Sequence, residues 1–155
     1  MKRVLLATVL WMFSTVLAAA YEIGDVVVVI RESEIKVGTK VTDQVYPGFG
    51  TEVEAVQGDF LWVNFGNAGW IHKNNVVPLK DAVAYFTRQI RTNPSAELYQ
   101  ARASVWLRQE MYDNALADIN EARAMIDLLQ KNEYIKAPDV KLLEAARDKA
   151  IAAAK

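Results

Sequence analysis

The sequence predicts an α+β protein, in which a small antiparallel β-barrel is followed by antiparallel α-helices. Two patterns in the 155 residues support this fold class. Residues 21–79 hold short runs of β-branched and aromatic residues separated by glycine-containing turns, as in small all-β units. From residue 80 onward, apolar residues recur at helical spacing instead. Because no Gly/Ser-rich linker separates the two patterns, we predict that the helical part, residues 80–155, follows the barrel directly.

The first 20 residues have the order of a secretory signal peptide. Residues 1–3 give a short positive start, Val4–Leu17 is uncharged and mostly apolar, and residues 18–20 are small alanines. We therefore predict cleavage after Ala20 and a periplasmic or secreted protein. The alternative is an uncleaved membrane anchor, for which the apolar run is at the short end of the roughly 20 residues needed. We expect contact with a membrane only in that case.

Composition excludes several classes of function. The chain has no cysteine, which removes disulfides, thiol catalysis and thiolate metal sites. An exported protein without cysteine is more typical of bacteria than of small eukaryotic secreted domains. The formal net charge is −1, and loss of Lys2 and Arg3 with the signal peptide, which holds no acid, makes it −3. A mildly acidic chain with no basic block is not expected to bind nucleic acid.

Five short strands are predicted in the barrel. Each is β-branched, aromatic or alternating in pattern, and the second and third are joined as a hairpin through Gly58-Asp59. The strands are Val26–Ile30, Thr51–Val56, Phe60–Phe65, Trp70-Ile71 and Val76-Val77. The passage between the first two, through Gln44, is polar and is predicted to be irregular.

The glycine and tryptophan spacing in this part resembles the bacterial SH3-like (SH3b) domain. The matching pieces are Gly48-x-x-x-x-Val53, Gly58-Asp59-x-x-Trp62-Val63, Gly69-Trp70-Ile71 and Val76. The resemblance covers nearly all of 21–79 and implies binding of cell-wall peptides, proline-rich segments or partner domains. A proline-rich ligand is disfavoured, because Leu61, His72 and Asn75 stand where aromatic and proline residues line that groove.

Four aromatic residues are candidates for ligand binding: Tyr46, Phe49, Trp62 and Trp70. For the two tryptophans, packing in or beside the core is the alternative interpretation. Tyr46 and Phe49 flank Pro47-Gly48 in a predicted loop, where core packing explains an aromatic residue less well. His72 is the only histidine and is expected in a surface loop, because a lone histidine makes neither a metal site nor a triad.

Four helices are predicted in the second part, near residues 81–93, 96–109, 112–130 and 138–154. Asp81 is the expected N-cap of the first helix, and Asn93-Pro94 ends it. Ser95 caps the second helix, and Pro138 opens the fourth.

The second and third helices are similar to the tetratricopeptide (TPR) repeat, a pair of antiparallel helices in about 34 residues. The matching positions are Tyr99, Ala103, Trp106, Tyr112, Ala115 and Ala122. Arg102 stands where leucine is usual and Glu110 where glycine is usual. The first helix matches the second half of a preceding repeat, whose own first helix is missing. We therefore predict that the barrel takes that place by packing on Val83 or Phe86, and that the fourth helix is a cap.

The TPR resemblance implies a groove-facing row on the second helix. Its positions are Glu97, Gln100, Ser104 and Leu107, and simple solvation is the alternative interpretation. About three repeats are needed for a stable array, so we expect the helices to pack against the barrel or against a second copy of the chain.

Motifs of catalysis are absent from the sequence. It has no Gly-rich phosphate loop, no GxSxG, no HExxH and no His/Cys cluster, so we expect no enzyme activity, no cofactor and no metal. The sequence thus predicts an exported adaptor that binds a protein or peptide partner, or forms a homo-oligomer. The alternative is a cell-wall module that binds peptidoglycan glycan or peptide through the barrel.

Overall fold

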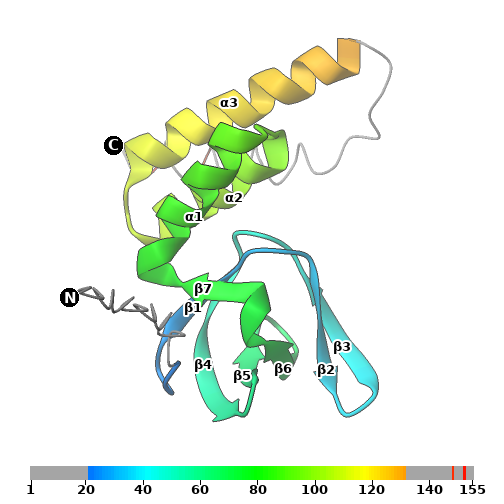
Figure 1. Cartoon of the computed structure of the whole chain (residues 1–155). Helices are drawn as coiled ribbons and strands as arrows, with labels where there is room; N and C mark the ends of the chain where they lie inside the picture. Colours follow the sequence, from blue (N-terminus) through cyan, green and yellow to red (C-terminus); the bar gives the residue numbers. More distant parts are fainter. Residues whose placement is uncertain (1–20, 132–147, 149–151, 153–155) are drawn as a thin grey trace, which may run out of the picture.

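The computed structural model describes residues 21–131 together with residues 148 and 152. The predicted signal peptide and, apart from those two positions, the predicted fourth helix at 138–154 lie outside the described residues. The described part is an α+β arrangement, a seven-stranded antiparallel sheet followed by three helices (Figure 1). The strands are β1 (Val26–Val29), β2 (Ser33–Val37), β3 (Lys40–Val45), β4 (Gly50–Gln57), β5 (Phe60–Asn64), β6 (Ala68–His72) and β7 (Val76–Pro78). The helices are α1 (Leu79–Thr92), α2 (Ala96–Arg108) and α3 (Tyr112–Lys131), with a 3-10 turn, η1, at Lys73–Asn75.

The prediction of an irregular passage through Gln44 is wrong, because β2 and β3 pair there as a hairpin. Only one face of this hairpin reaches the core, through residues such as Ile35 and Val45. The other face carries Glu34 and Lys36. A strand pair with so few buried apolar residues gives only a weak alternation of polar and apolar residues, so the two strands could not be recognised in the sequence.

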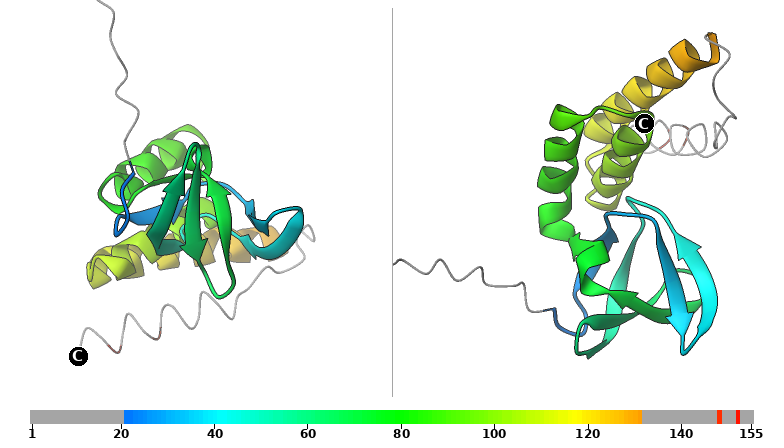
Figure 2. Two further views of the ribbon diagram at one scale, coloured as in Figure 1. Left: turned by 90° about the horizontal axis from the view of Figure 1, so that it is seen from below. Right: turned by 45° about the vertical axis from the view of Figure 1, so that its right-hand side comes forward.

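The strands follow the order β3-β2-β6-β5-β4-β1-β7, and the edge strands β3 and β7 do not pair, so the sheet is not closed. The long strand β4 pairs with β1 near Glu52 and with β5 from Val53 to Gln57. Its register shifts between Val53 and Ala55, a bulge that bends the strand. The sheet therefore curls around one interior (Figure 2).

That interior, the sheet core, is built from aliphatic residues of the strands. Its members are Val27, Val29, Ile35, Val45, Val53, Leu61, Val63, Ile71 and Val76, with Tyr21 and Phe65 packed against it. Tyr21 also donates a hydrogen bond from its hydroxyl to the Val76 carbonyl oxygen at 3.1 Å. Burial, followed by the nearby carboxylates of Asp81 and Asp25, raises the pKa of this phenol.

Helix α1 begins at Leu79, immediately after β7, so the prediction of Asp81 as its N-cap is wrong. The N-cap position is Pro78, whose fixed φ suits the start of a helix and which has no N–H to leave unpaired. Asp81 lies in the first turn instead, where a carboxylate still interacts favourably with the helix dipole.

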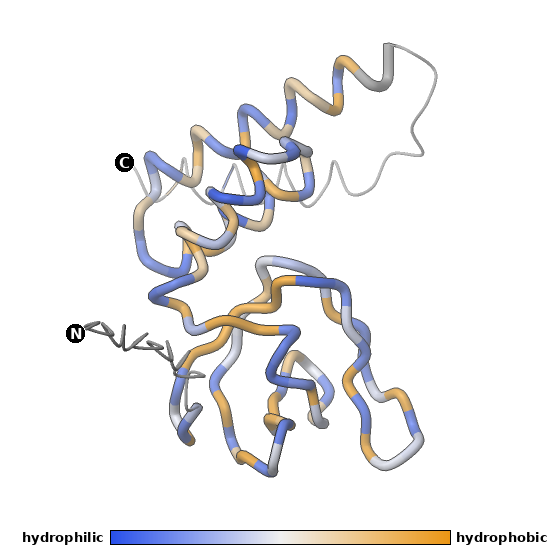
Figure 3. Tube along the Cα trace, in the orientation of Figure 1, coloured by the Kyte–Doolittle hydropathy of each residue, from blue (hydrophilic) through white to orange (hydrophobic). Residues whose placement is uncertain are grey.

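The sheet and the helices share a second apolar cluster, the seam. Its buried members are Val28 of β1, Ala82 and Phe86 of α1, and Ala101 and Val105 of α2. Because successive strand residues face opposite ways, Val28 points to the helices while Val27 and Val29 point into the sheet core. Figure 3 shows apolar residues on β1 and β7, which lie beside the helices. The prediction of packing on Val83 or Phe86 is confirmed, since Phe86 is fully buried in the seam and Val83 packs against it.

The three helices run in alternating directions. At one end of the α1–α2 pair, the Gln109 side chain donates to the Leu79 carbonyl oxygen, and further along Arg102 bonds Thr87. Helices α2 and α3 pack against each other, and Ala103 of α2 and Ala115 of α3 are both buried. Near the start of α2 and in the second half of α3, Ala96, Ala122 and Ile126 form a separate buried cluster. The bounds of α1, α2 and α3 lie within two residues of those predicted for the first three helices.

Candidate functional site

Two aromatic pairs lie on the outer face of β5 and β6 and form what we call the aromatic strip: Phe60, Trp62, Trp70 and His72. Trp62 lies opposite Trp70 across the strands, and Phe60 lies opposite His72. The ring centroids of the tryptophan pair are 5.1 Å apart at an interplanar angle of 75°. The Phe60–His72 pair repeats this edge-to-face geometry at 5.2 Å and 83°. Phe60 is 47% exposed, and the other three rings are partly buried.

Strand alternation explains why these rings point outward. Leu61, Val63 and Ile71 fill the inner face of β5 and β6 and are buried in the sheet core. The residues between them must then face out.

Gly69 allows β2 to approach β6 closely, because a Cβ there would lie 2.7 Å from Cγ2 of Ile35 and 2.9 Å from the Lys36 carbonyl oxygen.

Charged residues border the aromatic strip. On the β2 side, Lys36 is the cross-strand partner of Trp70, and its ammonium group forms an ion pair with Glu34 at 2.6 Å. On the β4 side, Glu54 is the extra residue of the bulge and adjoins Ala55, the partner of Trp62. Asp59 is exposed in the turn just before Phe60. The strip is thus an aromatic surface bordered by three acidic residues and one lysine.

The predicted aromatic site is divided between two places. Trp62 and Trp70 are brought together in the strip, whereas Tyr46 and Phe49 lie in the loop between β3 and β4, 49% and 45% exposed. This loop meets α2, since a Cβ on Gly48 would lie 2.6 Å from the Cα of Ala101. Gly48 also has φ +90°, so glycine is required there on two counts.

The prediction of His72 in a surface loop is wrong, because it closes β6 and belongs to the strip. Its Nδ1 accepts a hydrogen bond from the Asn74 backbone N–H at 3.1 Å and so caps η1. Phe60 was also missed as a site residue. The register of the β5–β6 hairpin, which pairs 60 with 72 and 62 with 70, is the signal that could have found both.

The predicted groove residues of α2, Glu97, Gln100, Ser104 and Leu107, recur at helical spacing on one face. Glu97 is exposed, and the other three are partly buried. The Ser104 hydroxyl donates to the Gln100 carbonyl oxygen at 3.1 Å, so it is used within the helix.

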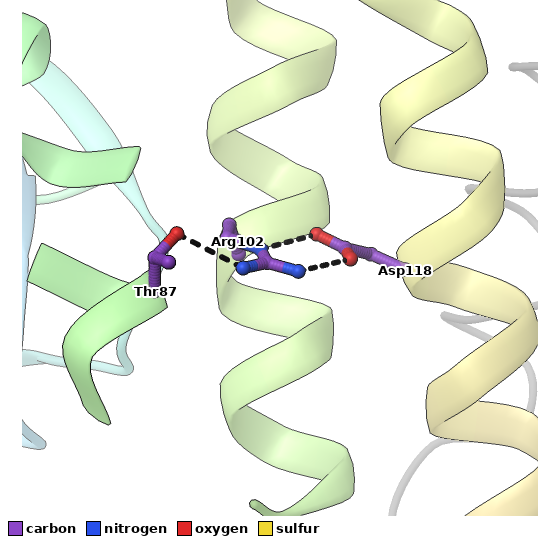
Figure 4. Close-up of polar contacts among 3 residues, drawn as sticks. All are labelled: Thr87, Arg102 and Asp118. Carbon is purple, nitrogen blue, oxygen red and sulfur yellow. Dashed lines mark hydrogen bonds and ion pairs between the residues drawn. The ribbon is translucent and has the colours of Figure 1, made fainter. Parts of the chain in front are cut away.

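Arg102 joins the three helices (Figure 4). Its Nε and Nη2 donate to the two carboxylate oxygens of Asp118 on α3 at 2.8 and 2.7 Å, and its Nη1 donates to the Thr87 hydroxyl on α1 at 2.9 Å. The guanidinium also lies 5.7 Å from the centre of the Tyr99 ring. Hydrogen bonding to Asp118 outweighs desolvation and raises the pKa of Arg102. Arg102 thus has a specific structural role in holding the three helices together.

Among residues 21–131, 148 and 152, no three His, Asp or Glu side chains are grouped to hold a metal ion. In the same part of the chain, no helix combines the length and apolar character that a membrane span requires.

Comparison of the chain with protein-family models, curated proteins and solved structures finds no match. The function is therefore argued from the site alone.

Proposed function

We propose that this chain is an exported, non-catalytic adaptor, in which an SH3-like barrel and a TPR-like helical unit form one body that holds a protein partner on the aromatic strip. The observation that carries the proposal is the strip itself. Large aromatic side chains with few rotatable bonds supply contact area at low entropic cost and dominate protein interfaces. Three such rings and the His72 imidazole, in two ordered pairs, form a surface suited to a partner.

The motif residues support the SH3-like part of the proposal. The Gly69-Trp70-Ile71 motif forms most of β6, with the glycine at the close approach to β2. The curled sheet encloses a single core to which every strand contributes.

The helical contacts support the TPR-like part. Ala96 of α2 and Ala122 of α3 share one buried cluster, and Glu110 has φ +60° at the turn where the repeat usually has glycine. Strand β1 packs through Val28 on the face of α1 and α2 that a preceding helix would otherwise cover.

Cross-linking capture from bacterial envelope extract tests the adaptor function. The wild type should retain a specific protein, identified by mass spectrometry, and Trp62→Val should lose it, because valine preserves the strand but removes the ring. Tyr46→Ala is the matched control, since it removes an exposed aromatic residue outside the strip. Light scattering distinguishes a foreign partner from a second copy. A monomer that captures nothing, or equal capture by Trp62→Val, would contradict the proposal.

The exposed loop aromatics favour a second candidate, binding to peptidoglycan. Tyr46 and Phe49 form an aromatic surface separate from the strip, at the end of the sheet nearest α2. Co-sedimentation with purified peptidoglycan should then fall for Tyr46→Ala and Phe49→Ala. Absence of sedimentation by the wild type would exclude this candidate and leave the adaptor proposal intact.

A further inference from the structure

We propose that the aromatic strip receives an arginine side chain from an extended segment of the partner, so that the ligand is a cationic peptide. This inference rests on the proposed adaptor function and names the chemistry of the partner that the adaptor binds.

The ring faces of the strip are suited to a cation. The π-face of an aromatic ring is electrically negative and attracts guanidinium or ammonium groups, most strongly at tryptophan. Within the part of the chain that the structure describes, Arg102 over Tyr99 is the one cation positioned over an aromatic ring. Trp62 and Trp70 therefore have no such cation from the described residues.

The Arg102 site shows the arrangement that the strip lacks. There a guanidinium lies 5.7 Å from a ring centre and pairs with a carboxylate at 2.7 Å. Arginine suits this combination because its planar group both stacks on rings and donates a fork of hydrogen bonds to carboxylates. The aromatic strip and its border supply the rings and the carboxylates; the one cation of that border, Lys36, is paired with Glu34, and among the described residues no cation lies over a ring of the strip.

The border carboxylates decide between a cationic and an apolar ligand. Glu54 and Asp59 are exposed beside the strip, and Glu34 is paired with Lys36. That pair is half exposed, at 52% and 49%, so it contributes little stability and can exchange partners. An apolar ligand would desolvate carboxylates without compensation, and an acidic ligand would be repelled.

The spacing of the two ring pairs favours an extended segment. They are two residues apart along β5, which places them about 7 Å apart at the usual rise of a strand. Alternate side chains of an extended peptide have the same repeat. One arginine can thus meet the tryptophan pair while a neighbouring side chain contacts Phe60 and His72.

NMR titration of the exported protein with the capped peptide Gly-Arg-Gly-Arg-Gly tests this inference. The indole N–H resonances of Trp62 and Trp70 should shift, whereas that of Trp106 in α2 should not. A peptide with norleucine in place of arginine is the control and should produce no shift. Equal shifts with norleucine would show an apolar site and overturn the proposal, as would the absence of any shift with the arginine peptide.

Matched variants separate a site from general charge attraction. Trp62→Val should weaken binding about fivefold, and Glu54→Gln about threefold, whereas Tyr46→Ala and Asp127→Asn should leave it unchanged. Glu54 is exposed in the bulge and Asp127 is exposed on α3, so neither change should unfold the protein. Equal weakening by Glu54→Gln and Asp127→Asn would reduce the effect to net charge and overturn the proposal. If the peptide fails but Trp62-dependent capture from envelope extract persists, the adaptor stands and only its cationic ligand is wrong.

Discussion

The sheet core and the seam draw their residues from different sets of elements. Each of the seven strands contributes at least one buried aliphatic residue to the sheet core, and no helix contributes any. The seam, in contrast, needs Val28 of β1 together with residues of α1 and α2. Among the described residues, a further helical cluster has Ala96, Ala122 and Ile126 as buried members. The sheet therefore encloses a core of its own, whereas α1 and α2 bury part of their apolar surface against β1.

The largest expected effect comes from emptying the seam. Phe86→Ala should reduce the free energy of unfolding by about 3–5 kcal/mol, because it deletes a fully buried ring and leaves a cavity. Urea denaturation measures the loss, and hydrogen exchange should show α1 and α2 opening before the sheet.

Phe60→Ala is the matched control for Phe86→Ala, since it removes the same ring from the exposed strip. It should cost about 1 kcal/mol or less, as expected for a surface substitution that breaks one aromatic pair. Equal costs for the two variants would mean that the helices do not depend on the seam.

The Arg102 network provides the next largest effect, and it lies within the helices. Arg102→Met should cost about 2–3 kcal/mol, because it leaves the buried Asp118 carboxylate without its partner. The cost is below that of a fully buried pair since Arg102 is still 18% exposed. Adding Asp118→Leu should recover most of the loss in a thermal or urea unfolding measurement. A double variant as unstable as the single one would show that the network specifies the helix arrangement and is not merely compensating a buried charge.

A smaller, pH-dependent effect is expected in the sheet. The pKa of Tyr21 is raised above its ordinary value of 10.0, chiefly by burial. At pH values between the ordinary pKa and the raised pKa of the folded protein, the unfolded chain loses the phenolic proton and the folded chain keeps it. The stability that this burial contributes is therefore fully present below the ordinary pKa and is lost as pH rises through the folded pKa. Urea denaturation at increasing alkaline pH should show a weaker decline for Tyr21→Phe. Parallel declines for both proteins would assign the pH dependence to other groups.

The smallest effect concerns the turn between α2 and α3. The Glu110 N–H bonds to the Leu107 carbonyl oxygen and the Met111 N–H to that of Trp106, the pattern of a Schellman motif. Glu110 has φ +60° at the position where glycine is free of strain. Glu110→Gly should therefore raise stability by about 0.5–1 kcal/mol, measured as an increase in Tm, whereas Glu110→Ala should not. A lower Tm for the glycine variant would contradict this account.

The same contrast explains how far the sequence could predict the fold. Strand β1 and the hairpin of β4 and β5 carry dense β-branched or alternating patterns. The three helices carry apolar stripes, and Ser95 caps α2, so these elements were predicted. The β2–β3 hairpin places few apolar residues in the core and gave no clear signal. The start of α1 was predicted two residues late. The helix begins directly after Pro78, the last residue of β7, and not after Asp81, whose residue type favours an N-cap.

The candidate site was predicted only in part. Trp62 and Trp70 are recognisable by residue type, and the structure pairs them. Their separation from Tyr46 and Phe49 depends on the curl of the sheet and on the contact of Gly48 with α2. Neither feature has a local pattern in the sequence. The border of Glu34, Lys36 and Glu54 depends on register and on a bulge, which are tertiary properties.

The open sheet has a consequence for solubility. Unpaired strand edges can template the addition of strands from other chains and so promote aggregation. Edge β3 carries Lys40 and Asp43, and its register with β2 is interrupted by an irregularity, both of which hinder such addition. Edge β7 has only three residues, and Pro78 cannot donate a ladder hydrogen bond. The two edges are thus protected by different means against the addition of a strand from another chain.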